Sequence, residues 1–279
     1  MISLCLSVLS SALVSIVMRL STNKIQHNLG MLTMNYIVCT LLSGVFGGYQ
    51  GALDVIDPRI GAVLAMGSIN GALYLAGFVL MQINIRKNGV VLSSIFQKLG
   101  LLVTLVVSVV FYHEIPDWLQ GIGFVIAVAA IVLMNYQKGS GSAGSGLGLI
   151  GMLLSCGMAD AMAKVFTESG AAELEGQFLF YTFVVATGLC FALMTAKGQK
   201  IGVREAFFGT MIAVPNFFST KFLLGALESL SAVIVYPVFS VGTILVVTLM
   251  GVLAFRERLK KQQWIGIAAI LVALVLLNV

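Results

Sequence analysis

The chain has 279 residues, of which 59% are hydrophobic and only 10% are charged, and its formal net charge is +5. Soluble domains carry about 25% charged residues, and a single soluble core could not bury this much apolar surface. The composition therefore excludes an ordinary soluble protein and predicts one that faces lipid. The positive charge does not indicate nucleic-acid binding, because most basic residues lie in short loops between apolar runs, where they set membrane topology.

Apolar runs of membrane-spanning length recur along the whole chain. A spanning helix needs about 20 apolar residues to cross about 30 Å of hydrocarbon. The first run has no basic segment before it and no small-residue cleavage site after it, so we expect a retained helix rather than a signal peptide. The sequence thus predicts an all-α, multi-pass protein of the cytoplasmic membrane with ten transmembrane helices. We place these helices at residues 2–20, 29–49, 59–82, 89–111, 117–136, 147–168, 177–196, 205–227, 231–255 and 263–278.

A Gly/Ser-rich stretch divides the chain almost in half. Residues 139–146 read Gly-Ser-Gly-Ser-Ala-Gly-Ser-Gly, the composition of a flexible linker. A natural connector and an engineered replacement of a natural loop both fit this composition. We therefore divide the chain into a first five-helix unit at residues 1–136, a linker at 137–146 and a second five-helix unit at 147–279.

The two units share a sequence pattern near their ends. Five residues of the first unit align without a gap with five of the second, and so many matches at one fixed offset favour duplication over chance. Since each unit has an odd number of crossings, its tandem copy must sit upside down, which predicts an inverted repeat. The matched residues are Phe96, Glu114, Gln120, Gly123 and Asn135 in the first unit and Phe239, Glu257, Gln263, Gly266 and Asn278 in the second.

Basic and acidic loops alternate along the chain. The positive-inside rule places loops rich in Lys and Arg in the cytoplasm, so we expect the odd-numbered loops inside and both termini outside. The odd-numbered loops contain Lys24, Arg86, Lys87, Lys138, Lys197, Lys200, Arg204, Arg256, Arg258, Lys260 and Lys261. The even-numbered loops contain Arg59 and mainly acids, including Glu114, Asp117, Glu168, Glu173, Glu175 and Glu228.

Each unit also contains an apolar helix that ends in a glutamate, followed by a short turn and Gln-x-x-Gly. The first copy is Phe111-Tyr112-His113-Glu114 with Gln120 to Gly123, and the second is Ala254-Phe255-Arg256-Glu257 with Gln263 to Gly266. Together with Tyr236-Pro237-Val238, this pattern resembles the EamA-like branch of the drug/metabolite transporter superfamily over nearly the whole chain. The first copy departs from it, with Ser94 in place of Pro237. The resemblance implies ten helices around a central cavity that opens alternately to each side and carries small metabolites.

No catalytic, metal or cofactor motif is recognisable in the sequence. There is no Walker A sequence, and neither His27 nor His113 has metal-ligand spacing. The cysteines lie inside apolar runs and are typical of packing residues. We therefore expect a protein that is not an enzyme and has no cofactor and no metal. Glu114 and Glu257, just before the fifth and tenth helices, are expected to stabilise the free N–H groups of those helices.

Polar residues within the apolar runs indicate a site, because polar groups in a membrane usually face the bundle interior. Lys98 stands out, since it lies about ten residues, or about 15 Å, from the helix end. Spacing groups the other candidates on helices 1, 3, 4, 6, 8 and 9. Instead of lining a site, the neutral residues could serve helix packing, and the basic side chains could extend to the membrane interface. The candidates are Lys98, Gln97, Asn70, Tyr74, Asn216, Tyr236, Ser240, Arg19, Asp160, Lys164 and Lys221.

These features favour a secondary transporter of a small polar metabolite, such as an amino acid or a related organic anion or zwitterion. A multidrug or organic-cation exporter is the alternative, and it would need Asp160, which Lys164 could neutralise as an i,i+4 pair. A non-transporting membrane scaffold is a third reading, but a scaffold would not need Lys98 at this depth. We expect membrane lipid and a small-molecule substrate as partners, and a monomer or homodimer.

Overall fold

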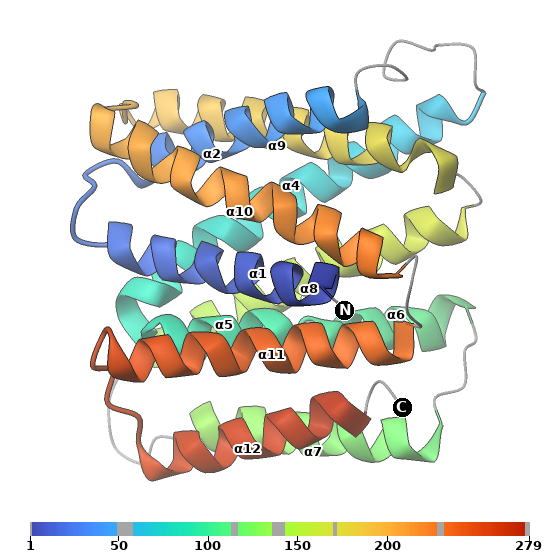
Figure 1. Cartoon of the computed structure of the whole chain (residues 1–279), viewed down its shortest axis with the longest axis vertical. Coiled ribbons are helices and arrows are strands. Elements are labelled where there is room, and N and C mark those ends of the chain that lie inside the picture. The colour runs from blue at the N-terminus through green and yellow to red at the C-terminus, as the bar shows by residue number, and fades with distance from the viewer. Residues whose placement is uncertain are drawn as a thin grey trace.

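The computed structural model describes residues 2–48, 58–112, 117–135, 143–169, 172–227 and 232–276, and these residues form an all-helical bundle without strands (Figure 1). The first half contains α1 (Ile2–Ser21), α2 (Asn28–Ser43), the π-helical turn η1 (Gly44–Gly48), α4 (Ile60–Asn88), α5 (Val90–Lys98), α6 (Leu101–Tyr112) and α7 (Trp118–Asn135). The second half contains α8 (Ala143–Glu168), the 3-10 turn η2 (Ala172–Leu174), α9 (Glu175–Ala196), α10 (Val203–Leu227), α11 (Ala232–Leu253) and α12 (Lys261–Leu276).

Each of the ten expected segments contains helix in the described residues, although their lengths differ. Six stretches are long and apolar enough to cross a membrane: Ile2–Ser21, Asn28–Phe46, Ile60–Asn88, Val90–Tyr112, Gly146–Phe166 and Glu175–Ala196. Three apolar helices are shorter, at Trp118–Ala130, Val238–Leu253 and Lys261–Leu276. The eighth segment is α10, which contains Pro215 within the helix.

The fourth expected segment, 89–111, corresponds to one membrane-spanning stretch, Val90–Tyr112, but a turn divides it into two helices. α5 ends at Lys98 and α6 begins at Leu101, with Gly100 N–H donating to the Gln97 carbonyl oxygen at 3.1 Å. At the break the chain approaches α8 closely, and a Cβ on Gly100 would lie 2.8 Å from the Gly157 nitrogen. Hydropathy alone did not locate the break, because the apolar run continues after it from Leu99 to Val103.

The linker is shorter at its C-terminal side than the sequence predicted. α8 begins at Ala143, so residues 143–146 are helical, whereas 137–142 lie outside the described residues. α8 packs on α4 from its first turns, where the Asn84 amide donates to the Gly148 carbonyl oxygen at 2.8 Å. This anchoring explains why a Gly/Ser composition is compatible with helix here.

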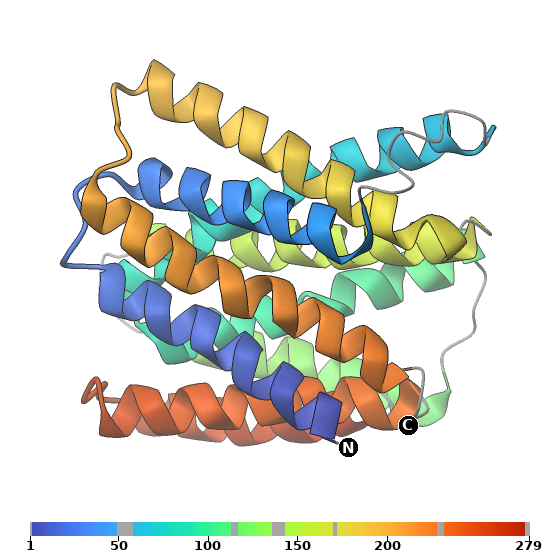
Figure 2. The same ribbon diagram turned by 45° about the horizontal axis from the view of Figure 1, so that its top comes forward.

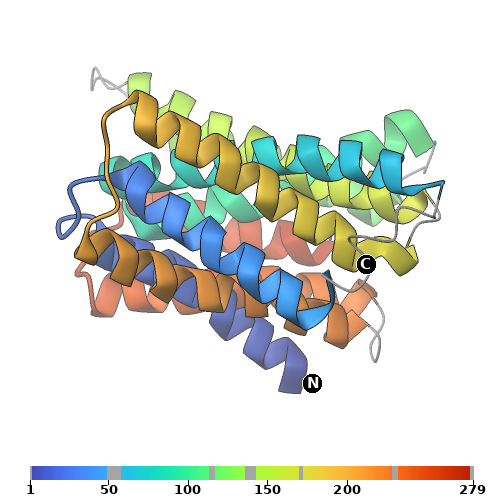
Figure 3. The same cartoon turned by 90° about the horizontal axis from the view of Figure 1, so that it is seen from above.

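Helices of the two halves alternate throughout the bundle. From top to bottom, Figure 1 shows α2 with α9, α4 with α10, α1 with α8, α5 and α6 with α11, and α7 with α12. α2 and α9 lie side by side (Figure 3), as do α1 and α10 (Figure 2). The partners within the pairs α2–α9 and α7–α12 run in opposite directions (Figure 1).

The contacts between the halves occur as equivalent pairs. α10, the third helix of its half, packs most extensively on α1 and α2. α4, the third helix of the first half, packs in the same way on α8 and α9. Exchange of the two halves therefore leaves the pattern of helix contacts unchanged.

The ends of α1, α4 and α9, which precede basic loops, lie at one end of the bundle, on the left in Figure 1. There the Arg86 guanidinium donates to Asn28 Oδ1 at 2.7 Å, and Arg204 donates to the Lys24 carbonyl oxygen at 3.5 Å. The opposite end includes the ion pair Arg59–Glu173, at 3.4 Å. Among the described residues, these basic contacts and the Arg59–Glu173 ion pair thus lie at opposite ends of the bundle, and the orientation in the membrane stays a prediction.

Candidate functional site

Lys98 lies where the fourth helix breaks, as the last residue of α5. Its Nζ donates to Ser11 Oγ of α1 at 3.1 Å and lies 3.8 Å from the centre of the Phe239 ring of α11. The side chain is partly buried. A cation over an aromatic face is stabilised by the ring quadrupole, so both halves of the chain help to hold this ammonium.

Asp160 of α8 influences Lys98 electrostatically, although the two side chains form no direct ion pair in the described structure. The two charges attract each other across the helix interface, and Asp160 also acts electrostatically on Cys156 and Tyr74. Asp160 is exposed in the isolated chain. The sequence had paired it with Lys164, whose Nζ lies 5.8 Å from the Tyr112 ring.

Tyr74 of α4 is held on several sides. Its phenol interacts with Thr220 of α10, and its ring stacks on Phe78 with centroids 5.7 Å apart. Phe183 meets the same ring edge-on at 5.9 Å, and the Tyr36 hydroxyl donates to the Tyr74 carbonyl oxygen at 3.2 Å. This packing restricts the Tyr74 side chain to one orientation.

The interactions of Lys98, Asp160 and Tyr74 join six helices. These helices are α1, α4, α5, α8, α10 and α11, which are the first, third, fourth, sixth, eighth and ninth expected segments. Gln97, beside Lys98, is partly buried, and Ser240, beside Phe239, is buried. The backbone of Tyr236 belongs to α11, but its side chain falls outside the described residues.

The comparisons with known proteins agree with this architecture. The sequence profile of the EamA-like transporter family matches the chain twice, over residues 1–136 and 145–279. The chain belongs to the EamA-like transporter family. The two matches also fit the drug/metabolite transporter superfamily and a two-repeat architecture. Together with the apolar helices, they support a multi-pass membrane protein.

Two further likenesses extend over almost the whole EamA-like chain. A protein of Haemophilus influenzae, described as "Uncharacterized protein", is 25% identical over 277 residues, which cover 95% of this chain and 93% of that protein. A solved structure titled "Crystal structure of protein" has a TM-score of 0.63 at 11% identity and covers 98% of this chain and 96% of its own. The latter likeness supports the fold alone.

Asn70 and Asn216, the matched amides of this EamA-like protein, both lie in contacts between the halves. Asn70 Nδ2 donates to Thr182 Oγ1 of α9 at 3.3 Å, and Asn216 Nδ2 donates to Cys39 Sγ of α2 at 3.6 Å. All four residues are buried. The two bonds are equivalent, since each joins the third helix of one half to the second helix of the other. Asn70 Oδ1 has no hydrogen-bond partner in the described structure.

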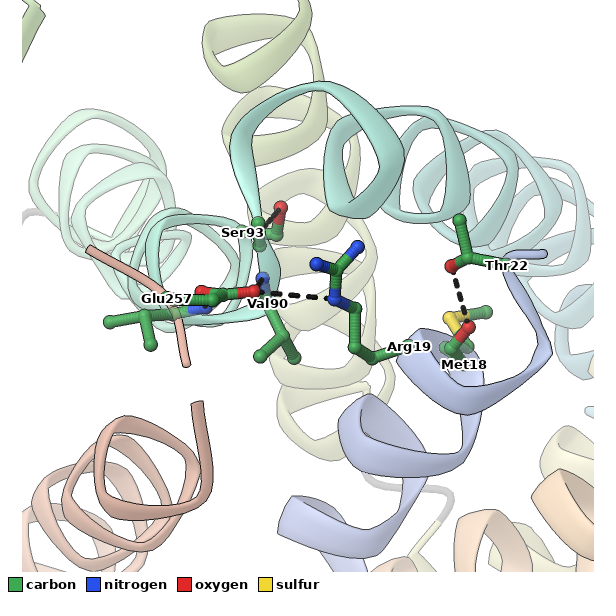
Figure 4. A network of polar contacts seen from close by, with 8 residues as sticks. Met18, Arg19, Thr22, Val90, Ser93 and Glu257 are labelled. Carbon is green, nitrogen blue, oxygen red and sulfur yellow. Dashed lines mark hydrogen bonds and ion pairs between the residues drawn. The ribbon is translucent and has the colours of Figure 1, made fainter. Parts of the chain in front are cut away.

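Arg19 lies at the basic end of α1, away from Lys98, and pairs with Glu257 at 3.4 Å between Nε and Oε1 (Figure 4). Glu257 accepts hydrogen bonds from the N–H groups of Val90, at 2.8 Å, and Val91, at 3.3 Å. The expectation that Glu257 stabilises the tenth helix was therefore wrong, because it caps α5 instead. Glu114 lies outside the described residues.

Lys221 is exposed, and its Nζ lies 3.8 Å from the centre of the Phe46 ring of η1. The Phe46 ring also contacts Phe217 and Phe218. Lys221 thus belongs to an aromatic cluster at the α10–η1 contact rather than to the group around Lys98.

Sequence reasoning did not identify two neighbours of Lys98, namely Phe239 and Cys156. Phe239 had been noticed only as the repeat partner of Phe96, although an aromatic residue opposite a membrane lysine signals a cation–π contact. Cys156 precedes Asp160 by four residues and therefore shares its helix face. Among the described residues, no group of three or more His, Cys, Asp or Glu side chains is placed to hold a metal ion.

Proposed function

We propose that this protein is a secondary active transporter that moves a small polar metabolite, an amino acid or a related organic anion or zwitterion, across the cytoplasmic membrane by alternating access. The observation that carries the proposal is Lys98, a partly buried ammonium at a helix break that contacts both halves of the chain. Relative motion of the halves would change its surroundings, as alternating access requires.

The charges of Lys98 and Asp160 support an aqueous site. Charged groups within a bilayer are costly, and in membrane proteins they face the bundle interior or a water-filled cavity. Asp160 is exposed in the isolated chain but interacts with Lys98 on a neighbouring helix. Water between the halves satisfies both observations, whereas lipid around this carboxylate would be strongly unfavourable.

The same proposal includes ten transmembrane helices in two inverted five-helix repeats. It is supported by the opposite directions within the pairs α2–α9 and α7–α12 (Figure 1). It is also supported by Glu257, which follows the end of α11 and bonds to the start of α5, so that these two helices run in opposite directions. Broken helices next to the substrate are a recurring feature of inverted-repeat transporters, and the break after Lys98 fits this pattern.

The two alternatives fit the described contacts less well. A cation exporter needs an acidic group that attracts its cargo, but the positive charge of Lys98 acts on Asp160 and would weaken that attraction. A non-transporting scaffold has no need of opposite charges between its halves. Both alternatives remain outcomes of the following experiment.

A metabolite screen by thermal shift, followed by counterflow of the labelled ligand in proteoliposomes, tests the proposal. We expect a ligand that raises the melting temperature in a concentration-dependent way and that exchanges across the bilayer. Lys98→Met, which keeps most of the side-chain volume, should fold normally and lose at least about tenfold in exchange rate, equivalent to about 1.4 kcal/mol. The matched control is Lys197→Met, at the exposed end of α9.

Two results would contradict the proposal. If a folded Lys98→Met variant exchanges the ligand at the wild-type rate, Lys98 is not part of the substrate site. If the protein exchanges neither a metabolite nor an organic cation, the result supports a non-transporting scaffold. Exchange of organic cations alone supports the exporter.

A further inference from the structure

α5 is a short, separate helix with a glycine near each end. It contains nine residues, Val90–Lys98. Before it, Gly89 has φ +86°, a conformation that residues with side chains disfavour, and after it Gly100 lies in the turn that leads into α6. Residues at the ends of elements absorb the backbone changes when one element moves relative to its neighbours. α5 can therefore tilt as a unit between these two points.

The two ends of α5 are held by different contacts. At the N-terminal end, Glu257 Oε1 accepts a hydrogen bond of 2.8 Å from Val90 N–H, and the same carboxylate pairs with Arg19 of α1 at 3.4 Å (Figure 4). At the C-terminal end, Lys98 donates to Ser11 Oγ of α1 at 3.1 Å. The nine residues of α5 span only about 12 Å between these contacts. A movement of the N-terminal end therefore displaces Lys98 as well.

Acceptor side chains of the second half bind backbone N–H groups of the first half at the basic end of the bundle, where Arg86 and Arg204 lie. Besides Glu257, Glu205 Oε1 accepts two such bonds, at 2.9 and 3.1 Å, from the loop between α1 and α2. Gln199 Oε1 accepts one, at 2.9 Å, at the start of α2. These bonds join the halves at this end. Glu257 differs from the other two acceptors because its bonds end on α5, which carries the candidate substrate lysine.

We propose that Glu257 is a positioning residue for Lys98, and that through α5 it keeps the basic end closed. While its carboxylate caps α5, Lys98 stays against Ser11 and Phe239. When the basic end opens, Glu257 leaves α5, which tilts and moves Lys98. This inference rests on the proposed transport function and adds to it a link between the substrate site and the closure of one end. Lys98 contacts the substrate, whereas Glu257 acts only through α5.

The packing of α11 on α5 allows this closure to be made permanent. A Cβ on Gly251, in the last turn of α11, would lie against the Val91 side chain in the first turn of α5. Cysteines at these two positions suit a disulfide, whose Cβ atoms lie about 3.5–4.5 Å apart. Oxidation of the double variant Val91→Cys/Gly251→Cys would fix α5 to α11 beside Glu257.

The first test uses this bridge in a Cys5→Ser, Cys156→Ser background. We expect oxidation to slow counterflow of the ligand in proteoliposomes at least about tenfold, and reduction to restore it, because alternating access requires the basic end to open. The ligand should still raise the melting temperature of the oxidised protein, since Lys98 stays in place. The two single-cysteine variants, treated in the same way, are the controls. Equal exchange by the oxidised and reduced protein, or loss of the thermal shift on oxidation, would overturn the inference.

The second test needs no substrate. Ser15 is buried and lies between Ser11 and Arg19 on the same face of α1, so Ser15→Cys in the same background reports whether the basic end is open. Glu257→Gln, which loses the negative charge, should raise the rate of modification by a small methanethiosulfonate reagent at least about fivefold, as a shift toward the open state requires. Glu173→Gln, at the opposite end, is the control. An unchanged rate in Glu257→Gln would show that Glu257 does not hold this end closed.

The third test separates positioning of Lys98 from a general loss of contacts at the basic end. Glu257→Gln should weaken ligand binding at least about threefold, because a smaller fraction of the protein then holds Lys98 in the binding position. Glu205→Gln removes a comparable carboxylate that does not touch α5, and it should bind the ligand as the wild type does. Equal affinities of the two variants would contradict the positioning role.

The outcomes distinguish this inference from the function on which it rests. If the wild-type protein exchanges a ligand and the oxidised double variant exchanges it equally fast, the role of Glu257 is wrong and the transporter stands. If the wild-type protein exchanges nothing, the proposed function fails. The Ser15→Cys measurement then still decides whether Glu257 closes the basic end.

Discussion

Glu257 accepts a hydrogen bond of 2.8 Å from the backbone N–H of Val90, the first residue of α5, which belongs to the other half of the chain. The same carboxylate pairs with Arg19 of α1 and bonds to Val91 N–H at 3.3 Å. One glutamate from the second half thus joins two helices of the first. Gly89 makes this approach possible, because it has φ +86° and a Cβ there would lie 2.7 Å from Glu257 Oε2.

Loss of this cap should destabilise the protein. We expect Glu257→Ala to lower the free energy of unfolding by roughly 1–2 kcal/mol, since it leaves the N-terminal N–H groups of α5 without an acceptor. Glu257→Gln keeps an acceptor oxygen and should have a smaller effect. Thermal unfolding in detergent measures both, with Glu173→Ala at the exposed opposite end as the control. A fully stable Glu257→Ala variant would contradict the capping role.

The extent to which the sequence predicted the structure depended on the kind of signal. Long apolar runs predicted the helical segments, which follow from local composition, and residues repeated at one fixed offset predicted two related halves. The break after Lys98 was missed, since it depends on the approach of Gly100 to Gly157, about 57 positions away along the chain. For the same reason the sequence did not predict the electrostatic interaction between Asp160 and Lys98, which lies on another helix.

The close approach of α6 and α8 gives a second prediction. A Cβ on Gly157 would lie 2.5 Å from the Gly100 carbonyl oxygen and 2.7 Å from Val103 Cβ, so one of the helices would have to move. We expect Gly157→Ala to destabilise the protein by about 1–3 kcal/mol, as overpacked cores do. Gly188→Ala is the control, since no neighbouring atom lies within 4 Å of its Cβ. If the two variants have equal melting temperatures, α6 and α8 can move apart at little cost, and the prediction is wrong.

Orientation in the membrane is a third prediction. The positive-inside rule places the basic end, which includes Arg258, in the cytoplasm and Asp117 outside. An impermeant thiol reagent added to intact cells should therefore label Asp117→Cys but label Arg258→Cys only after the cells are opened. Both positions are exposed, so reactivity itself should not differ. The native Cys5 is exposed and Cys156 is partly buried, and both are replaced by Ser in both variants. Labelling of Arg258→Cys in intact cells would reverse the orientation.

The fourth prediction uses Cys156 as a native probe of the site. This thiol is partly buried, lies against Gly77 of α4 and interacts electrostatically with Lys98 and Asp160. Cys39 and Cys190 are buried, so a Cys5→Ser background leaves Cys156 as the accessible native thiol in the described structure. A small methanethiosulfonate reagent should modify it, because water that reaches Asp160 on the same helix face also reaches Cys156.

A ligand between the halves should then protect Cys156. We expect a saturating concentration of the strongest stabilising ligand to slow modification at least about fivefold, in proportion to the fraction of occupied sites. Lys98→Met should abolish this protection while Cys156 stays reactive, since the ligand no longer binds. The rate is followed by mass spectrometry of the intact protein, with Cys156→Ser as the blank. Modification at the same rate with and without a ligand that stabilises the fold would place that ligand elsewhere in the molecule.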